Sequence, residues 1–194
     1  SIIPENLGDL NSLEILRLVD NDLTGEIPDN ITNLSNLSVL KLNSNNLSGS
    51  IPDNIGALLN LDSLMLSSNS LSGAIPQSIV ELPHIKYLDI NRNDLSGHIP
   101  ANIGALTSLK WLYLDNNNLT GEIPPSIGNL YNLLKLQLLN NALSGQIPEN
   151  FCNLYSSNEN IQIWLHNNQL CKDSAPECIP EHHIGIQYNQ AACD

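Results

Sequence analysis

The chain has 194 residues, of which 41% are hydrophobic, and its 20 acidic and 7 basic residues give a formal net charge of −13. This acidity argues against nucleic acid or an anionic membrane surface as a partner, because such binders need a basic patch that displaces counterions. No run approaches the roughly 18 consecutive apolar residues of a membrane span, so we expect no membrane insertion of this chain.

From the first residues onward the sequence matches itself when it is shifted by 24 residues. One leucine column contains Leu16, Leu40, Leu64, Leu88, Leu112 and Leu136. An asparagine column contains Asn21, Asn45, Asn69, Asn93, Asn117 and Asn141. Glycine and proline columns complete the consensus LxxLxLxxNxL(S/T)GxIPxxIxxLxx. A period of this length predicts a repeat solenoid, whose coils bury their apolar faces only by stacking on one another.

Each column of the repeat has a mechanical role. The LxL motif alternates as a strand does, with leucines inward and the intervening residues outward. The asparagine amide can satisfy backbone groups that the following turn leaves unpaired, so stacked coils form an asparagine ladder. The glycine permits a tight bend, and the proline precedes a short helical turn or loop. We expect six strands at 24-residue spacing and a seventh at 162–166, displaced by three residues, in one parallel sheet.

The motif LSGxIPxxIGxL resembles the plant-type leucine-rich repeats of receptor kinases, receptor-like proteins and polygalacturonase-inhibiting proteins. The resemblance covers residues 1 to about 154 and implies a right-handed superhelix. It also implies a curved parallel sheet on the concave side, short 3-10 or loop segments on the convex side, and a second row of short strands from LxGxIP. Members of this family mostly bind proteins, peptides or small secreted ligands. The family's N-terminal cap, a helix with paired cysteines, is not recognisable here, so we expect a truncated or uncapped N-terminal end.

Residues 155–194 are expected to form the last repeat and a cap, because all four cysteines lie in the last 43 residues. Their gaps contain no CxxC, which favours disulfides over a zinc site and predicts a secreted protein or a cell-surface ectodomain. Counting along the coil favours Cys152–Cys178 with Cys171–Cys193 over the sequential pairing, which stays open. This tail resembles the cysteine-containing caps of secreted leucine-rich-repeat proteins of marine bacteria and algae.

The outward positions of the seven expected strands are the candidate binding surface. We define seven strand windows around them: 14–20, 38–44, 62–68, 86–92, 110–116, 134–140 and 161–167. These windows hold six of the seven basic residues, five of the 20 acidic residues and both tryptophans, so the face is nearly neutral on an acidic body. The candidate ligand-binding residues are Tyr87, Asp89, Trp111, Tyr113, Lys135, Gln137 and Trp164. Exposed aromatic residues beside charged ones are typical of a site that binds a protein or peptide. The alternative interpretation is that outward strand positions simply tolerate aromatic residues.

Catalysis has little support, since the five histidines form no recognisable triad and no nucleotide-binding, HExxH or EF-hand motif occurs. We expect no enzyme activity, cofactor or metal, and we interpret Glu181-His182-His183 as a solvated loop of the cap. A second functional hypothesis is binding to ice or to a polysaccharide surface through repetitive polar columns. Its main element is the hydroxyl column Thr24, Ser48, Ser72, Ser96, Thr120 and Ser144.

Overall fold

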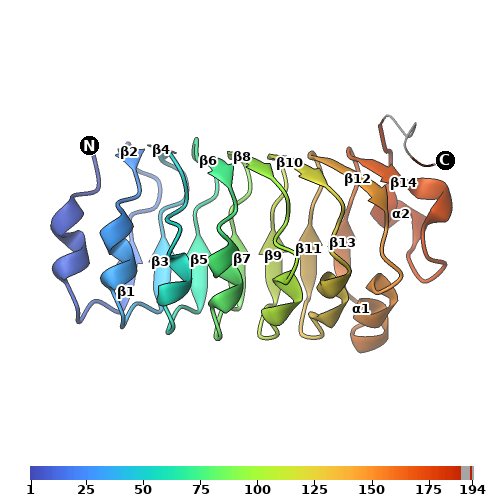
Figure 1. The fold of residues 1–194 in the computed structure, drawn as a ribbon, viewed down its shortest axis with the longest axis horizontal. Helices are drawn as coiled ribbons and strands as arrows, with labels where there is room; N and C mark the ends of the chain where they lie inside the picture. Colours follow the sequence, from blue (N-terminus) through green and yellow to red (C-terminus); the bar gives the residue numbers. More distant parts are fainter. Residues whose placement is uncertain (189–192, 194) are drawn as a thin grey trace.

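The protein forms an elongated solenoid, with its first coil and its C-terminal coil at opposite ends of the long axis (Figure 1). The structure is a computed structural model and describes residues 1–188 and 193. Each coil runs through a strand of the main sheet, a second short strand and a helical segment. None of the helices in the described part of the chain is long and apolar enough to cross a membrane.

The first strand of each coil joins a seven-stranded parallel sheet in the order β1-β3-β5-β7-β9-β11-β13. The strands are Ile15–Arg17 (β1), Val39–Lys41 (β3), Ser63–Met65 (β5), Tyr87–Asp89 (β7), Trp111–Tyr113 (β9), Lys135–Gln137 (β11) and Gln162–Trp164 (β13). Leu16 pairs with Leu40, which confirms the 24-residue register. Leu136 pairs with Ile163, so the last strand is displaced by three residues as expected. We call the outer surface of this sheet the concave face.

The LxGxIP segments form a second row of parallel strands along the solenoid. Its strands are Thr24–Glu26 (β2), Asn46–Ser48 (β4), Ser72–Ala74 (β6), Asp94–Gly97 (β8), Asn118–Gly121 (β10), Ala142–Gln146 (β12) and Gln169–Cys171 (β14). They divide into a five-stranded sheet, β14-β12-β10-β8-β6, and the pair β2-β4. The glycine of each LSG or LTG motif has a φ between +74° and +80°, a left-handed conformation that explains why this column contains glycine alone.

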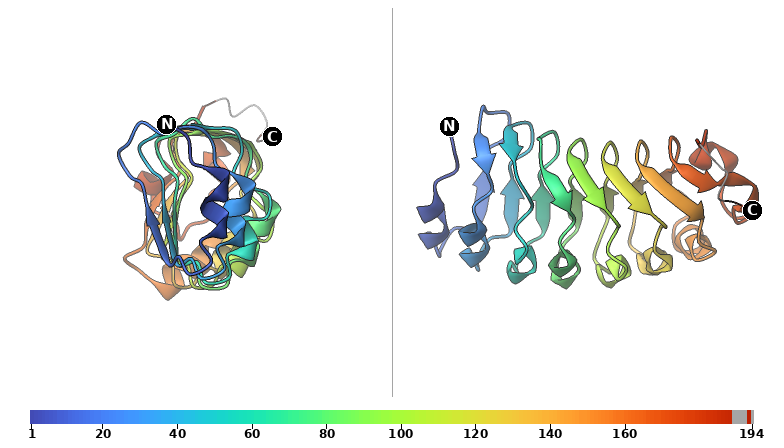
Figure 2. Two further views of the ribbon diagram at one scale, coloured as in Figure 1. Left: turned by 90° about the vertical axis from the view of Figure 1, so that its left-hand side faces the viewer. Right: turned by 45° about the horizontal axis from the view of Figure 1, so that its top comes forward.

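Helical segments lie on the side opposite the seven-stranded sheet, as the view along the solenoid axis in Figure 2 shows. The 3-10 helices are Glu5–Asp9 (η1), Asp29–Asn33 (η2), Ile55–Ala57 (η3), Gln77–Glu81 (η4), Ile103–Ala105 (η5), Pro125–Asn129 (η6) and Lys172–Ser174 (η7). The α-helix Phe151–Ser157 (α1) takes the place of the 3-10 helix in the next coil. The three additional residues that displace β13 lie within this helix and the segment that joins it to the strand.

Leucine and isoleucine side chains from every coil form one continuous buried core between the sheet and the helical side. The asparagine column closes the core at the end of each main strand. The Asn117 Oδ1 accepts a hydrogen bond from the Leu95 backbone N at 3.0 Å. Its Nδ2 donates to the carbonyls of Ile90 and Leu114, both at 3.1 Å. From Asn45 onward, each ladder asparagine connects two coils through backbone groups that would otherwise be buried without partners.

The C-terminal end is covered by a cap held by two disulfides, Cys152–Cys178 and Cys171–Cys193. This is the pairing that counting along the coil favours. The short helix Glu181–Ile184 (α2) packs on β13 and continues the backbone ladder, since the Leu165 N donates to the His183 carbonyl at 3.0 Å.

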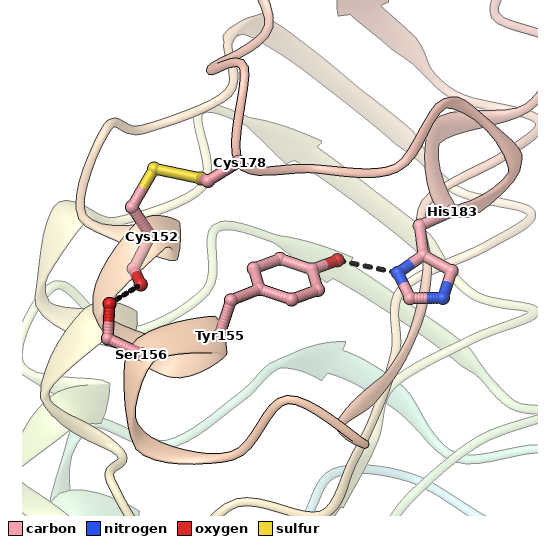
Figure 3. The surroundings of a disulfide bond; sticks show 5 residues. All are labelled: Cys152, Tyr155, Ser156, Cys178 and His183. Carbon is pink, nitrogen blue, oxygen red and sulfur yellow. Dashed lines mark hydrogen bonds between the residues drawn. A yellow bond between two sulfur atoms is a disulfide. The ribbon is translucent and has the colours of Figure 1, made fainter.

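A side-chain contact joins α1 to α2 beside the first disulfide. The Tyr155 hydroxyl lies 2.5 Å from the His183 Nδ1, while Cys152 on the same helix forms its bridge to Cys178 (Figure 3). Burial raises the pKa of Tyr155, so the phenol keeps its proton and donates a hydrogen bond to the ring nitrogen. The cap is therefore attached to the last full coil through both a covalent and a polar contact.

Candidate functional site

Three aromatic rings form one contiguous surface on the concave face, and we call Tyr87, Trp111 and Tyr113 the aromatic platform. Tyr87 and Trp111 are paired positions of β7 and β9, and their rings meet edge to face with centroids 4.8 Å apart. Trp111 and Tyr113 project from the same side of β9 and stack nearly parallel, with centroids 6.0 Å apart. All three side chains are half-buried, so the rings pack on one another and still present area to solvent.

Basic side chains border the platform where the strands begin. The Lys135 Nζ lies 5.7 Å from the centroid of the Trp111 ring, in a cation–π arrangement. Lys86 forms an ion pair with Asp62 at 2.7 Å. Partial burial disfavours ionisation of Asp62, but the bonds from Lys86 and Ser63 outweigh it and lower the pKa of that carboxyl. The positive charge of Lys86 is therefore already paired with a carboxylate of the same chain.

Two carboxylates border the platform on its other side, where the strands end. Asp89 accepts hydrogen bonds from the Ser67 Oγ at 2.9 Å and from the Asn91 backbone N at 3.3 Å. Burial, together with the nearby charge of Asp115, raises the pKa of Asp89. Asp115 itself is only 4% exposed and accepts from the Asn91 Nδ2 at 3.2 Å and the Asn116 Nδ2 at 2.6 Å.

The charge of the surface around the platform therefore changes along the strand direction. Read along β9 and its extension, the order is Lys110, Trp111, Tyr113 and Asp115, from basic through aromatic to acidic. Burial raises the pKa of Tyr113, and the charges of Asp89 and Asp115 raise it further. A ligand lying across this surface meets a different charge at each end, which can fix its orientation.

A row of asparagine amides extends the acidic border toward the C-terminus. The Asn140 Nδ2 donates to the Asn116 Oδ1 at 2.8 Å, and the Asn167 Nδ2 donates to the Asn140 Oδ1 at 2.6 Å. Because the Asn116 Nδ2 donates to Asp115, the chain of amides ends on that carboxylate. This arrangement fixes the orientation of the Asp115 side chain.

The seven residues predicted from the sequence fall into two groups. Tyr87, Trp111, Tyr113 and Lys135 are in direct contact, as described above. The remaining three stand in the column of Tyr113, where Asp89 and Gln137 are its paired neighbours and Trp164 follows Gln137. No ring contact joins Trp164 to the platform among the described residues, so the structure does not bring it into the same aromatic cluster.

Sequence reasoning did not include Lys110, Asn91 and Asp115 among the site residues. Lys110 stands in an adjacent outward column, and Asp115 lies two residues beyond Tyr113. The signal that could have found them is the same 24-residue alignment that identified the aromatic residues. The alignment does not predict the hydrogen bond between Asn91 and Asp115, because that bond depends on side-chain conformations.

The hydroxyl column lies on the second row of strands, away from the platform. Its members are exposed except for Ser144, which is half-buried. Hydroxyl groups of this column donate to carbonyls of the preceding coil, those of Ser48, Ser96 and Thr120 at 3.3–3.5 Å. These hydroxyls therefore help to join neighbouring coils and remain accessible to solvent.

Residues 181–183 of the cap do not converge on a common point. Glu181 pairs with Lys172 at 2.7 Å, and His183 is bonded to Tyr155. Within residues 1–188 and 193, no group of three or more His, Cys, Asp or Glu side chains is arranged to hold a metal ion.

Comparisons with known families and structures identify the repeats. A leucine-rich-repeat family model matches residues 35–95 and 59–119, and a second one matches residues 12–34 and 132–154. The ectodomain of the Arabidopsis receptor kinase HAESA, solved with an IDA peptide hormone, is 37% identical with a TM-score of 0.85; the match covers 95% of this chain and 31% of that one. The ectodomain of GASSHO1/SCHENGEN3 from Arabidopsis thaliana, solved with CASPARIAN STRIP INTEGRITY FACTOR 2, is 36% identical with a TM-score of 0.83 and coverages of 87% and 20%.

The chain thus spans a third or less of the length of these receptor ectodomains. A plant ice-binding protein shares the fold at 24% identity, with a TM-score of 0.65 and coverages of 97% of this chain and 77% of that one. No curated protein sequence gives a significant match. Because the family models together match most of the chain and the similar structures are plant receptor ectodomains, the chain belongs to the leucine-rich-repeat family, with repeats of the plant receptor type.

Proposed function

We propose that this chain is an extracellular recognition module that binds a peptide or an extended protein segment on the concave face. The observation that carries the proposal is the aromatic platform of Tyr87, Trp111 and Tyr113, whose rings contact one another and still present area to solvent. Such rings supply large apolar contact area at low conformational cost, and they are enriched among residues that dominate binding energy.

Three further observations support the proposal. Two similar ectodomains were solved in complex with a peptide hormone or an integrity factor. Disulfides such as Cys152–Cys178 persist in the oxidising surroundings of secreted proteins and ectodomains. The platform is also flanked by basic groups on one side and carboxylates on the other, an arrangement that favours one orientation of a polar chain.

The experiment is a selection of a random peptide library displayed on phage against the immobilised chain. Each enriched peptide is then tested on a variant that lacks the platform, Tyr87→Ser/Trp111→Ala/Tyr113→Ser. A matched control is Glu122→Lys, an exposed residue that follows β10 on the side of the second strand row. The proposal expects peptides that bind the parent and the control and lose binding to the platform variant. Selected peptides that bind the platform variant as well as the parent would refute it.

A second candidate is binding to ice or a polysaccharide surface through the exposed hydroxyl column. The observation in its favour is the series of accessible threonine and serine hydroxyls along the second row of parallel strands. The register sets Ser96 opposite Ala74 and Thr120 opposite Ala142, so hydroxyls of successive coils are not direct cross-strand neighbours. Against it, several of these hydroxyls already donate to carbonyls of the preceding coil. Thermal hysteresis and ice-recrystallisation assays on the parent and on a Ser48→Leu/Ser72→Leu/Ser96→Leu variant separate the two functions. Activity that the triple variant loses would favour this candidate.

A further inference from the structure

The acidic border of the platform carries negative charge that the chain does not neutralise. In the part of the chain that the structure describes, the ion pairs are Lys86–Asp62 and Lys172–Glu181, and neither involves Asp89 or Asp115. Arg92 influences Asp89 through its charge but forms no ion pair with it. Hydrogen bonds from Ser67, Asn91 and Asn116 offset part of the cost of shielding these two carboxylates, but neither ion pair supplies them with a counter-charge.

One of these carboxylates stands beside an aromatic ring. Asp89 and Tyr113 are paired residues of adjacent strands, about 4.8 Å apart at the backbone, and their side chains leave the same face of the sheet. After burial, the charge of Asp89 is the next cause that raises the pKa of the Tyr113 phenol, which agrees with this proximity. The platform already accommodates one cation, since the Lys135 ammonium lies over the Trp111 ring.

From this juxtaposition, and resting on the function proposed above, we infer that the ligand presents a guanidinium or ammonium side chain that is held between the Tyr113 ring and the Asp89 carboxylate. The ring attracts a cation through its negative face, and the carboxylate forms charge-assisted hydrogen bonds with it. Asp115 lies two residues beyond Tyr113 and adds a second negative charge. Binding would neutralise Asp89, whose ionised form is disfavoured by burial in the free protein.

An organic cation fits this site better than a metal ion does. A calcium ion takes six to eight oxygen ligands, and most structural sites supply several of them as carboxylates. Here two carboxylates meet, and the described residues include no group of three potential acidic, histidine or cysteine ligands. Aromatic faces such as Tyr113 do not coordinate calcium, whereas they stack well on a flat guanidinium.

The test is an NMR titration of the full chain with N-acetyl-arginine amide, which carries the cation and no carboxylate. N-acetyl-citrulline amide is the uncharged control of the same shape, and calcium chloride is the metal control. We expect the arginine compound to shift the signals of the Tyr113 and Trp111 rings in a saturable manner. The citrulline compound and calcium should leave these signals nearly unchanged.

The variant Asp89→Asn should raise the Kd of the arginine compound about ten-fold, because it removes the negative charge. The asparagine side chain can still accept the hydrogen bond from Ser67. Asp20→Asn is the matched control, because it removes an exposed acid that follows β1. Asp115→Asn removes the second negative charge of the site and is a second test of the same binding. Equal shifts with the citrulline compound, larger shifts with calcium, or undiminished arginine binding in both Asp89→Asn and Asp115→Asn would overturn the inference.

The peptide selection described under the proposed function keeps the two ideas separate. If selected peptides depend on Trp111 but show no enrichment of arginine or lysine, the cation inference is wrong and the recognition function stands. If no selected peptide depends on the platform, the recognition function itself is wrong.

Discussion

Gln187 in the cap makes the contacts that the ladder residue Asn168 makes one coil earlier. The Gln187 Oε1 accepts a hydrogen bond from the Leu170 backbone N at 3.3 Å. Its Nε2 donates to the carbonyls of Leu165 at 3.0 Å and Ile184 at 2.7 Å. Asn168 bonds in the same pattern, accepting from one backbone N–H and donating to a carbonyl of the preceding coil and one of its own. The cap thus supplies hydrogen-bond partners to backbone groups of the last coil, as another repeat would.

This relationship predicts that Gln187→Ala will destabilise the C-terminal end of the solenoid. The change removes the side-chain hydrogen bonds to the Leu170 backbone N and to the carbonyls of Leu165 and Ile184, each of which contributes roughly 0.5–1.5 kcal/mol. Hydrogen exchange of the backbone amides in residues 165–170 should accelerate, while exchange in the central coils stays unchanged, because repeat proteins respond locally. The control is Gln162→Ala, at an exposed position of β13. Unaltered exchange in residues 165–170 would contradict the role assigned to Gln187.

A second prediction concerns the dependence of cap stability on pH. Burial, followed by the charge of His182, lowers the pKa of His183 below its ordinary value of 6.5. The unfolded chain therefore takes up a proton at a higher pH than the folded cap does. The contribution of neutral His183 to the stability of the cap is fully present above pH 6.5. It is lost as the pH falls from 6.5 toward the pKa of His183 in the folded state.

Thermal melts between about pH 8 and about pH 5 measure this effect. The variant His183→Gln retains an acceptor for the Tyr155 hydroxyl and carries no ionisable ring, so it should lose less stability in acid than the parent. His84→Gln, a change at an exposed histidine outside the cap, is the matched control and should behave as the parent. Equal acid sensitivity of the parent and His183→Gln would exclude His183 as the group responsible.

A third prediction addresses a strained backbone position. The residue before each ladder asparagine has a positive φ, and in the fourth coil that residue is Arg92, with a φ of 51°. The left-handed conformation costs most residues roughly 1–2 kcal/mol, whereas asparagine adopts it more readily. Arg92→Asn should therefore raise the free energy of unfolding by up to about 1 kcal/mol. The midpoint of urea unfolding at an unchanged slope is the measurement, and a lower midpoint for Arg92→Asn would be inconsistent with strain.

A fourth prediction separates stability from binding on β9. Leu112 is fully buried, so Leu112→Ala should lower the free energy of unfolding by roughly 2–5 kcal/mol through the cavity it leaves. Trp111→Ala removes a half-buried side chain on the opposite side of the strand and should change stability much less. Thermal unfolding of the two variants provides the comparison. A larger loss of stability for Trp111→Ala than for Leu112→Ala would mean that the platform is structural.

The repetitive parts of the fold were predictable because they depend on spacing alone. The main strands, their register and the ladder follow from leucine and asparagine columns, and the displaced last strand follows from three inserted residues. Gln187 was not predictable, because its amide reaches the ladder from an irregular segment and with a longer side chain than asparagine. The positive φ at Arg92 also escaped, since that column contains no glycine to indicate it.

The candidate site was predictable in its position but not in its internal contacts. Alternation along β7 and β9 places Tyr87, Trp111 and Tyr113 on the outer side of the sheet, and the 24-residue register makes them neighbours. The edge-to-face and stacked geometries depend on side-chain rotamers, which the sequence pattern does not specify. For the same reason the sequence could not show that Trp164 lies apart from the aromatic cluster. Trp164 shares a column with Tyr113 but has no described contact with the platform rings.

The most direct test of the proposed function is the affinity of one library-selected peptide for Trp111→Ala, measured beside the parent and Glu122→Lys. If the platform anchors the ligand, Trp111→Ala should weaken binding by about 2 kcal/mol or more, roughly a thirty-fold rise in Kd, while folding is retained. Glu122→Lys should bind as the parent does. If Trp111→Ala instead binds with the affinity of the parent while Glu122→Lys abolishes binding, the ligand does not occupy the concave face.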